Sequence, residues 1–262
     1  MPPFRVVEGN LRHAMRFFAC PGDPAAVTEA PGLILIRSPV DYPVFNAALL
    51  SSPVSEAAPD LESRLRAARD HYKGLRLRWS CWVCEDLLEG LVRRRAPDIF
   101  LRQGLREIAV HSGMGAEQLR PPRRRMPEME FRRVHDLATR REFGEIAAVA
   151  FDLPLAIARR IYDAEPAWEG DFVAWVGYQD GAPIATAATV VAADAIGVYS
   201  VATLPEHRRR GVGEAIMRYA VDQAKRTSGL ERTILQSTEA GYSLYREMGY
   251  QKVTSFTVYV SG

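Results

Sequence analysis

Hydrophobic and polar positions in the second half of the chain predict a strand, a turn and a helix in direct succession. Residues 195–204 (AIGVYSVATL) are mostly apolar and β-prone, which predicts a buried strand. Pro205 has no backbone N–H and is therefore expected to end that strand. After residues 208–213 (RRRGVG), apolar residues recur at helical spacing at Val212, Ala215, Ile216, Tyr219, Ala220 and Ala224.

Similar patterns extend over the rest of the second half. The Asp-Gly pair within residues 179–182 is typical of a hairpin turn between two β-prone runs. The predicted strands cover residues 129–134, 172–178, 183–191, 232–236 and 251–260, and the predicted helices cover 140–151, 154–163 and 240–248. Strands that alternate with helices indicate a sheet flanked by helices.

The first half has a similar outline. Its predicted helices cover residues 10–19, 60–72 with Asp60 as a cap, a stretch from 86, and 97–104, and its predicted strands cover 32–37, 44–50, 75–84 and 107–112. In both halves a helical opening leads to two strands, and later to a helix and two more strands. We therefore expect a duplicated α/β (α+β) fold.

The length of 262 residues exceeds the usual size of one domain and favours two. Residues 121–127 (PPRRRMP) are predicted to be a linker, because prolines oppose both helix and central strand. This divides the chain into domains at 1–120 and 128–262. The three arginines at 123–125 could contact a nucleic acid or a nucleotide phosphate, but the absence of interleaved aromatic residues favours a solvated linker.

The overall charge gives little reason to expect a polyanionic partner. Lys and Arg total 34 against 32 Asp and Glu, a formal net charge of +2, so we expect neither a nucleic acid nor a membrane as a partner. No apolar run reaches the ~18 residues that span a bilayer, and the start, MPPFR, lacks the apolar core of a signal peptide. These features predict a cytoplasmic protein and leave its oligomeric state open.

The three cysteines are too few for a disulfide scaffold and suit a reducing compartment. Cys81 and Cys84 form a C-x-x-C motif, which occurs in redox and zinc sites. They lie in a strand-like run, where an offset of three residues puts the side chains on opposite faces. We therefore expect two core cysteines and no metal site.

The turn at residues 208–213 has the chemistry of an anion site. The first turn of a helix offers unpaired N–H groups and a partial positive charge, and Gly211 and Gly213 let a bulky anion approach the backbone. A Walker A loop needs G-x-x-x-x-G-K-[ST], which this sequence lacks, and a Rossmann fingerprint needs glycine or alanine where Ile216 stands. An ordinary glycine-containing turn with solvated arginines is the other interpretation.

Two motifs of the second half resemble those of the GNAT superfamily of acyl-CoA-dependent N-acyltransferases. They are TLPEHRRRGVG at residues 203–213 and LYREMGY at 244–250, the latter similar to the family's L-Y-x-x-x-G-F. The resemblance covers about residues 129–260, while the first half resembles the superfamily in element order alone. It implies two GNAT-like domains, each a mixed, mostly antiparallel sheet flanked by helices, with a degenerate first domain that lacks the cofactor motif.

The resemblance implies acetyl-CoA as co-substrate. The amides of residues 209–214 would hold its pyrophosphate, and a strand edge would pair with its pantetheine amides as an added strand does. The implied cofactor-binding residues are Val201, Ala202, Thr203, Arg208, Arg209, Arg210, Gly211, Val212, Gly213 and Glu214. Thr238 and Glu239 stand where the family often has an asparagine before the tyrosine motif.

The resemblance also implies direct attack of an amine on the thioester carbon, with Tyr245 as general acid for the leaving sulfur. Its apolar neighbours Leu244 and Met248 equally suit a core aromatic residue. The central strand has no carboxylate over residues 198–203, so the general base is left open between Glu169, Asp171, Asp194 and a water chain.

These inferences predict an N-acetyltransferase that acts on a primary amine of a small molecule or amino acid. The alternatives are a non-catalytic acyl-CoA-binding sensor or scaffold, and nucleic-acid binding through the arginine clusters, which the near-neutral charge favours least. We expect the acceptor pocket around residues 151–168 and at the interface with the first half. Tyr162, Trp168 and Trp175 would line that pocket or pack in the core.

Overall fold

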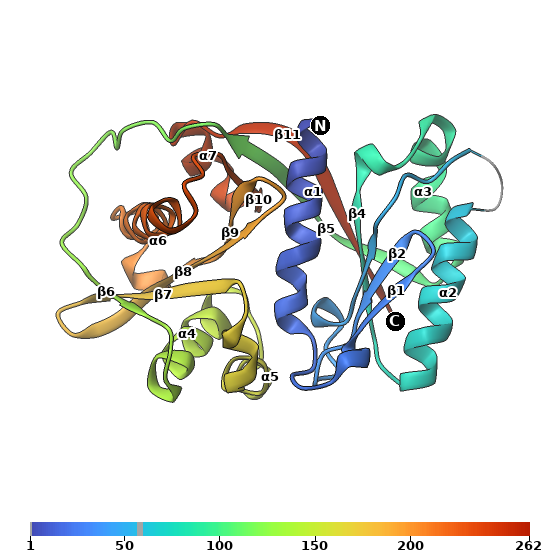
Figure 1. The fold of residues 1–262 in the computed structure, drawn as a ribbon, viewed down its shortest axis with the longest axis horizontal. Helices are drawn as coiled ribbons and strands as arrows, with labels where there is room; N and C mark the ends of the chain where they lie inside the picture. The colour runs from blue at the N-terminus through green and yellow to red at the C-terminus, as the bar shows by residue number, and fades with distance from the viewer. Residues whose placement is uncertain (1, 57–59) are drawn as a thin grey trace.

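One continuous sheet runs through the computed structural model, which describes residues 2–56 and 60–262 (Figure 1). Its strand order is β1-β2-β3-β4-β11-β5-β10-β9-β8-β7-β6. The strands are β1 (Val27–Ala30), β2 (Leu33–Ile36), β3 (Ala47–Leu50), β4 (Ser80–Cys84), β5 (Leu105–Ala116), β6 (Glu130–Arg133), β7 (Phe172–Gln179), β8 (Ala182–Ala192), β9 (Ala195–Thr203), β10 (Thr233–Ser237) and β11 (Gln251–Ser261).

Helices cover the sheet on both halves. They are α1 (Pro3–Ala14), α2 (Asp60–Leu75), α3 (Gly90–Arg102), α4 (Leu137–Ala150), α5 (Leu155–Tyr162), α6 (Val212–Ser228) and α7 (Glu239–Glu247). Figure 1 shows α2 and α3 beside the first-half strands and α4 to α7 beside the second-half strands, with α1 across the middle. Among the described helices, none is long and apolar enough to cross a membrane.

The two halves exchange strands. The C-terminal strand β11 lies between β4 and β5 of the first half, and β5 in turn pairs with β10 of the second half. Each half therefore has an antiparallel meander, one parallel pair and one antiparallel strand from the other half; the parallel pairs are β3 with β4 and β9 with β10. The division at residues 121–127 stays a prediction, although this segment contains neither helix nor strand.

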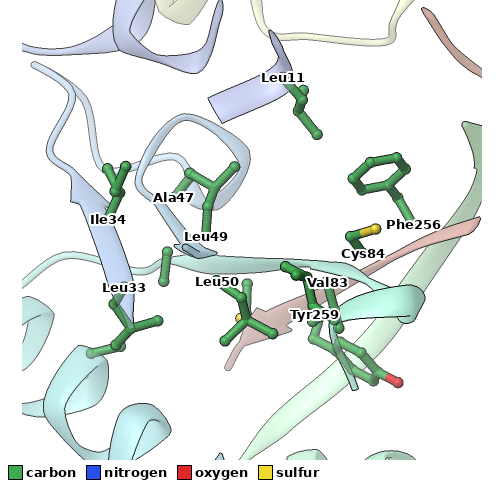
Figure 2. Close-up of a cluster of buried hydrophobic side chains, with 14 of the residues drawn as sticks. Leu11, Leu33, Ile34, Ala47, Leu49, Leu50, Val83, Cys84, Phe256 and Tyr259 are labelled. Atoms are coloured by element: carbon green, nitrogen blue, oxygen red, sulfur yellow. The ribbon is translucent and has the colours of Figure 1, made fainter. Parts of the chain in front are cut away.

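Helix α1 joins the halves through the core. Its buried residues Val6, Val7 and Leu11 pack in one cluster with Ala195 of β9 and Ile234 of β10. Figure 2 shows part of this cluster, including residues from α1, β2, β3, β4 and β11. Since the cluster draws on both halves, the burial of apolar surface stabilises them together.

Several predicted elements of the first half are wrong in their bounds. The helix predicted at 10–19 begins at Pro3 and ends at Ala14. It can begin at a proline because the first N–H groups of a helix have no intrahelical acceptor, so the missing N–H of proline costs no hydrogen bond there. The helices predicted from 86 and at 97–104 are one helix, α3, with Pro97 inside it. The strand predicted at 75–84 starts only at Ser80, since α2 continues to Leu75.

Asp60 is the first residue of α2 and not its cap. Its carboxylate accepts hydrogen bonds from Arg64, one turn later, and from the amide of Ser55. In the second half, the predicted strands and helices are confirmed to within a few residues. The hairpin turn has Asp180 and Gly181 both at positive φ, 51° and 78°, as a two-residue hairpin turn requires.

The strand position of the C-x-x-C cysteines is confirmed. Cys81 and Cys84 are both free and buried in β4, and burial raises their pKa values to about 12 and about 11. Thiols that stay protonated at neutral pH are poor nucleophiles and poor metal ligands. Within the described residues, no group of three or more His, Cys, Asp or Glu is arranged to hold a metal ion.

Candidate functional site

The parallel strands β9 and β10 diverge in the middle of the sheet. Their pairing runs from Ile196 with Thr233 to Val198 with Leu235 and then ends. Beyond that point β9 continues along β8 to Thr203, while β10 continues along β5. The edge of β9 that faces β10 therefore has no strand partner over residues 199–203, and its unpaired backbone groups can bind an extended ligand.

A β-bulge lies within this free edge. Ser200 has a positive φ of 49°, and the register between β8 and β9 shifts opposite it. The hydroxyl of Thr186 on β8 donates a hydrogen bond of 2.7 Å to the Ser200 carbonyl and so fixes the bulge. A bulge increases the local twist and redirects the side chains around it, so it helps to turn β9 away from β10.

The glycine-rich turn lies at the end of the free edge, where α6 begins. Gly211 is left-handed with a φ of 86°, and the first helical hydrogen bond of α6 runs from Ala215 N to Gly211 O. The amides of residues 209–214 consequently precede the first intrahelical hydrogen bond, at the positive end of the helix dipole. A Cβ on Gly213 would lie 3.3 Å from Thr203 Oγ1, so glycine keeps the turn close to the strand.

The side chains of the predicted cofactor residues divide into three groups. Arg209 and Arg210 are exposed, while Arg208 donates from Nε to the Thr203 carbonyl at 3.0 Å. Ala202 and Val212 are buried in the core. Glu214 is buried and paired with Arg218 at 2.8 Å, so its carboxylate is engaged and only its amide faces the turn.

The linker reaches the same turn. A Cβ built on Gly211 would lie 3.4 Å from Pro127 Cδ, 3.5 Å from Arg124 Nε and 3.9 Å from Arg124 Cζ. The exposed Arg124 guanidinium therefore lies against the glycine that precedes α6. Arg125 and Arg210 line one shallow surface hollow beside it. Positive charge from the linker thus adds to that of the helix terminus.

A cavity of about 430 Å³ lies where β9 and β10 separate. Second-half residues of β9, β10 and α7 form one wall, with Val198–Val201, Gln236 and Tyr245. First-half residues form the other wall, from α1, the loop before β3, β4 and β5. The predicted interface with the first half is thus where the structure has this cavity, and Phe151, Leu153 and Tyr162 from the predicted stretch also line it.

Tyr245 lines this cavity from α7. Its half-buried ring meets Tyr250 edge-on at a centroid distance of 5.9 Å, and burial raises the pKa of its phenol to about 12. Thr238 caps α7, and a Cβ on Gly241 would lie 2.9 Å from Tyr245 Cε2. The ring is therefore held tightly, with its hydroxyl protonated at neutral pH.

His111 on β5 is the residue that the sequence did not reveal. Its ring lines the cavity and stacks on Trp82 of β4 with centroids 5.6 Å apart and planes 13° from parallel. Burial lowers the pKa of His111, and a hydrogen bond to the backbone at Ser237 opposes that shift. Three buried nitrogens in this wall have no hydrogen-bond partner within the described part of the chain: His111 Nδ1, Trp82 Nε1 and Gln236 Nε2.

The three acids considered as bases do not line the cavity. Asp171 pairs with His13 Nε2 at 2.8 Å on the surface, and Glu169 and Asp194 are exposed. Two of the predicted aromatic wall residues also lie elsewhere: Trp168 donates to the Tyr162 carbonyl and packs in the core, and Trp175 packs on Tyr219. The sequence around Trp168 and Trp175 could not show whether these side chains line the cavity or pack in the core.

Comparison with known proteins gives a family match over part of the chain and a fold match over all of it. Residues 170–252 match the family model of the acetyltransferase (GNAT) domain. No curated protein sequence matches the chain.

Solved structures match most or all of the chain. The GCN5-related N-acetyltransferase from Kribbella flavida is similar with a TM-score of 0.74 and 21% identity, over 100% of this chain and 96% of that one. A tandem GNAT protein from the clavulanic acid biosynthesis pathway gives 0.59 and 12%, over 93% and 84%. A GCN5-related N-acetyltransferase from Sphaerobacter thermophilus gives 0.58 and 14%, over 82% and 72%. The predicted fold class is confirmed.

Proposed function

We propose that this chain, in which residues 170–252 match the acetyltransferase (GNAT) domain model, is an N-acetyltransferase that moves the acetyl group of acetyl-CoA to a primary amine of a small molecule. The observation that carries the proposal is the continuity of three features: the anion-binding turn, the free edge of β9, and a cavity at the end of that edge. A donor with a diphosphate, an amide-bearing arm and a thioester needs these three features in this order.

The residues present fit this donor. The amides of residues 209–214 and the nearby Arg124 offer donors and positive charge to a diphosphate. The unpaired edge at Val201 can exchange backbone hydrogen bonds with the amides of a pantetheine arm, as an added strand would. An arm on this edge would carry its thioester into the cavity that Tyr245 lines.

The chemistry follows from where protons must go. A neutral amine attacks the thioester carbon, the C–N bond forms, the C–S bond breaks, and the sulfur takes a proton from the Tyr245 hydroxyl. The proton that the nitrogen loses as the amide forms restores that hydroxyl. Burial keeps that hydroxyl protonated at neutral pH, since it raises the pKa to about 12. The same apolar surroundings would raise the pKa of a thiolate leaving beside it, which makes proton transfer to the sulfur easier.

The test combines binding with turnover. Calorimetric titration with acetyl-CoA measures donor affinity, and thiol release over a panel of small primary amines measures turnover. We expect Tyr245→Phe to lower kcat by about 100-fold or more, the usual size of a general-acid contribution, and to leave the acetyl-CoA Kd within a factor of two. Tyr219→Phe is the matched control, because Tyr219 packs on Phe131 of the neighbouring strand β6 and does not line the cavity.

The outcomes separate the alternatives. If the protein binds acetyl-CoA tightly but releases thiol with no amine, the acyl-CoA-binding sensor is the better hypothesis. If it does not bind acetyl-CoA, both the acetyltransferase and the sensor hypotheses are wrong. Equal losses of affinity and turnover in Tyr245→Phe would make this tyrosine a structural residue of the cavity.

A further inference from the structure

The cavity between the halves has an unusual lining for a site that handles an amine. Its lining residues include no Asp, Glu, Lys or Arg. Apolar side chains such as Leu11, Phe18 and Phe45 come from the first half, opposite Val198 and Leu235 of the second. The volume of about 430 Å³ is that of a small-molecule site, which typically measures ~300–1,000 Å³.

A charged group on the acceptor body would find no partner in this lining. A carboxylate moved from water to such a site loses its hydration and gains no arginine or lysine, which is costly. An alkyl or aromatic body instead gains from the burial of its surface. The cavity therefore favours an amine without a carboxylate, which narrows the acceptors expected from the sequence.

Two side chains that line the cavity from neighbouring strands have a buried nitrogen without a hydrogen-bond partner among the described residues. His111 Nδ1 and Gln236 Nε2 are buried and unpaired among the described residues, from the neighbouring strands β5 and β10. Buried polar atoms of this kind normally have a partner, so a ligand group is expected there. Because His111 Nδ1 has no hydrogen-bond partner among the described residues, it is free to carry the lone pair of the neutral ring and accept a proton.

We propose that the cavity binds a primary amine on an uncharged aromatic or alkyl body, and that His111 of the first half accepts the proton of its ammonium group. This rests on the proposed function. The ammonium gives one proton to His111 Nδ1, the amine nitrogen attacks the thioester carbon, and the C–S bond breaks. The sulfur takes a proton from Tyr245, the second proton of the nitrogen returns to the Tyr245 phenolate as the amide forms, and His111 passes the first proton to solvent, so each turnover releases one net proton.

The pH dependence of the wild-type enzyme is the first measurement. The other titratable side chains that line the cavity are Tyr42, Tyr162, Tyr199 and Tyr245, and no charged residue lines it. Burial lowers the pKa of His111 below its ordinary value of about 6.5. Since the base must be unprotonated, kcat with saturating phenethylamine should rise with pH through a midpoint below about 6.5 and then level off. A rate that climbs steadily toward the pKa of the free amine would overturn the role of His111.

Substitution is the second measurement. We expect His111→Gln to lower kcat by about 100-fold or more, the usual contribution of a general base, and to abolish the acidic limb of the profile. The acetyl-CoA Kd should stay within a factor of two, which also shows that the variant folds. His135→Gln is the matched control, because His135 is exposed in the segment between β6 and α4. Wild-type turnover and pH profile in His111→Gln would refute the proposal.

The acceptor class is tested by a matched pair. Phenethylamine and phenylalanine have the same aromatic body and differ by a carboxylate, so kcat/KM should be at least about 100-fold higher for phenethylamine, given the cost of an unpaired buried charge. Equal or better use of phenylalanine would refute the acceptor class while leaving the acetyltransferase proposal intact. If no amine releases thiol, the proposed function itself fails.

Discussion

Asn10 of α1 is a buried polar residue whose side chain hydrogen-bonds the first half to the second. Its Nδ2 donates to the carbonyls of Val190, Ala192 and Ala195 at 3.2, 2.8 and 3.0 Å, and its Oδ1 accepts from the Tyr199 hydroxyl at 2.6 Å. The side chain is fully buried. A Cβ on Gly197 of β9 would lie 1.9 Å from its Oδ1, so the strand has a glycine where the asparagine enters.

Asn10→Ala should destabilise the protein strongly. The change leaves the Tyr199 phenol and two buried carbonyls without this partner, and each orphaned group costs about 1–3 kcal/mol. Because the carbonyls keep part of their strand pairing, we expect a total near 4 kcal/mol, toward the upper end for a single substitution. With a urea m-value of ~3 kcal/mol/M, the unfolding midpoint should fall by about 1.3 M.

A double-mutant cycle isolates the contact. Tyr199→Phe should cost less, about 1–3 kcal/mol, because it orphans only Asn10 Oδ1. In urea unfolding followed by fluorescence, the Asn10→Ala, Tyr199→Phe pair should cost less than the sum of the two single changes. A loss below about 1 kcal/mol for Asn10→Ala, or additive effects of the two changes, would refute a shared buried network.

Replacing Asn10 with aspartate should make the stability of the protein depend on pH. Asn10→Asp keeps the acceptor for Tyr199 but puts a second oxygen against three carbonyls, so the folded-state pKa of the new acid lies above its unfolded value of ~3.9. The destabilisation is then full at neutral pH and falls as the pH drops through the folded pKa. Urea midpoints should therefore be closer to those of the wild type at pH 4 than at pH 7.

Further predictions concern the cavity, the turn and the cysteines. Gly241→Ala puts a Cβ 2.9 Å from Tyr245 Cε2 and should lower kcat about 10-fold or more with little change in acetyl-CoA Kd. Gly74→Ala is the control, because a Cβ there has no atom within 4 Å, and it should be neutral or slightly stabilising in thermal unfolding. Arg124→Ala should weaken acetyl-CoA binding about 5- to 10-fold at low salt and reduce its salt dependence in calorimetry, whereas Arg66→Ala on the exposed face of α2 should not. Native alkylation at pH 8, followed by mass spectrometry, should label half-buried Cys20 well before Cys81 and Cys84, whose pKa values burial raises to about 12 and about 11.

The second half of the fold could be predicted from the sequence because its signals are local. The turn at Asp180–Gly181 and the glycine at 211 each fix a backbone conformation within a few residues, and the flanking apolar runs do the rest. In the first half, two prolines made the helix bounds hard to predict. Pro3 begins α1, since proline fits the first turn of a helix. Pro97 lies inside α3, where packing holds the helix although proline disfavours a helix interior. Tertiary packing decided those bounds.

The site could be predicted only where a motif is continuous in sequence. Tyr245 and the turn at 208–213 belong to such motifs, but His111 lies in a strand whose own pattern gives no sign of chemistry. It lines the same cavity as Tyr245 because β5 extends from the first half to pair with β10, with Gly113 opposite Gln236. A strand exchange depends on contacts between residues far apart in sequence, which periodicity does not record.

The same exchange gives the first half a structural role at the cavity of the second. If β5 were absent, β10 would be an exposed edge strand. The cavity where β9 and β10 separate would then open to water on the side that β5 and Trp82 now close. Proton transfer to and from a reacting group is most effective where water is excluded. The first half therefore supplies a closed wall, held in register by Asn10 and carrying the imidazole of His111, beside the free edge of β9.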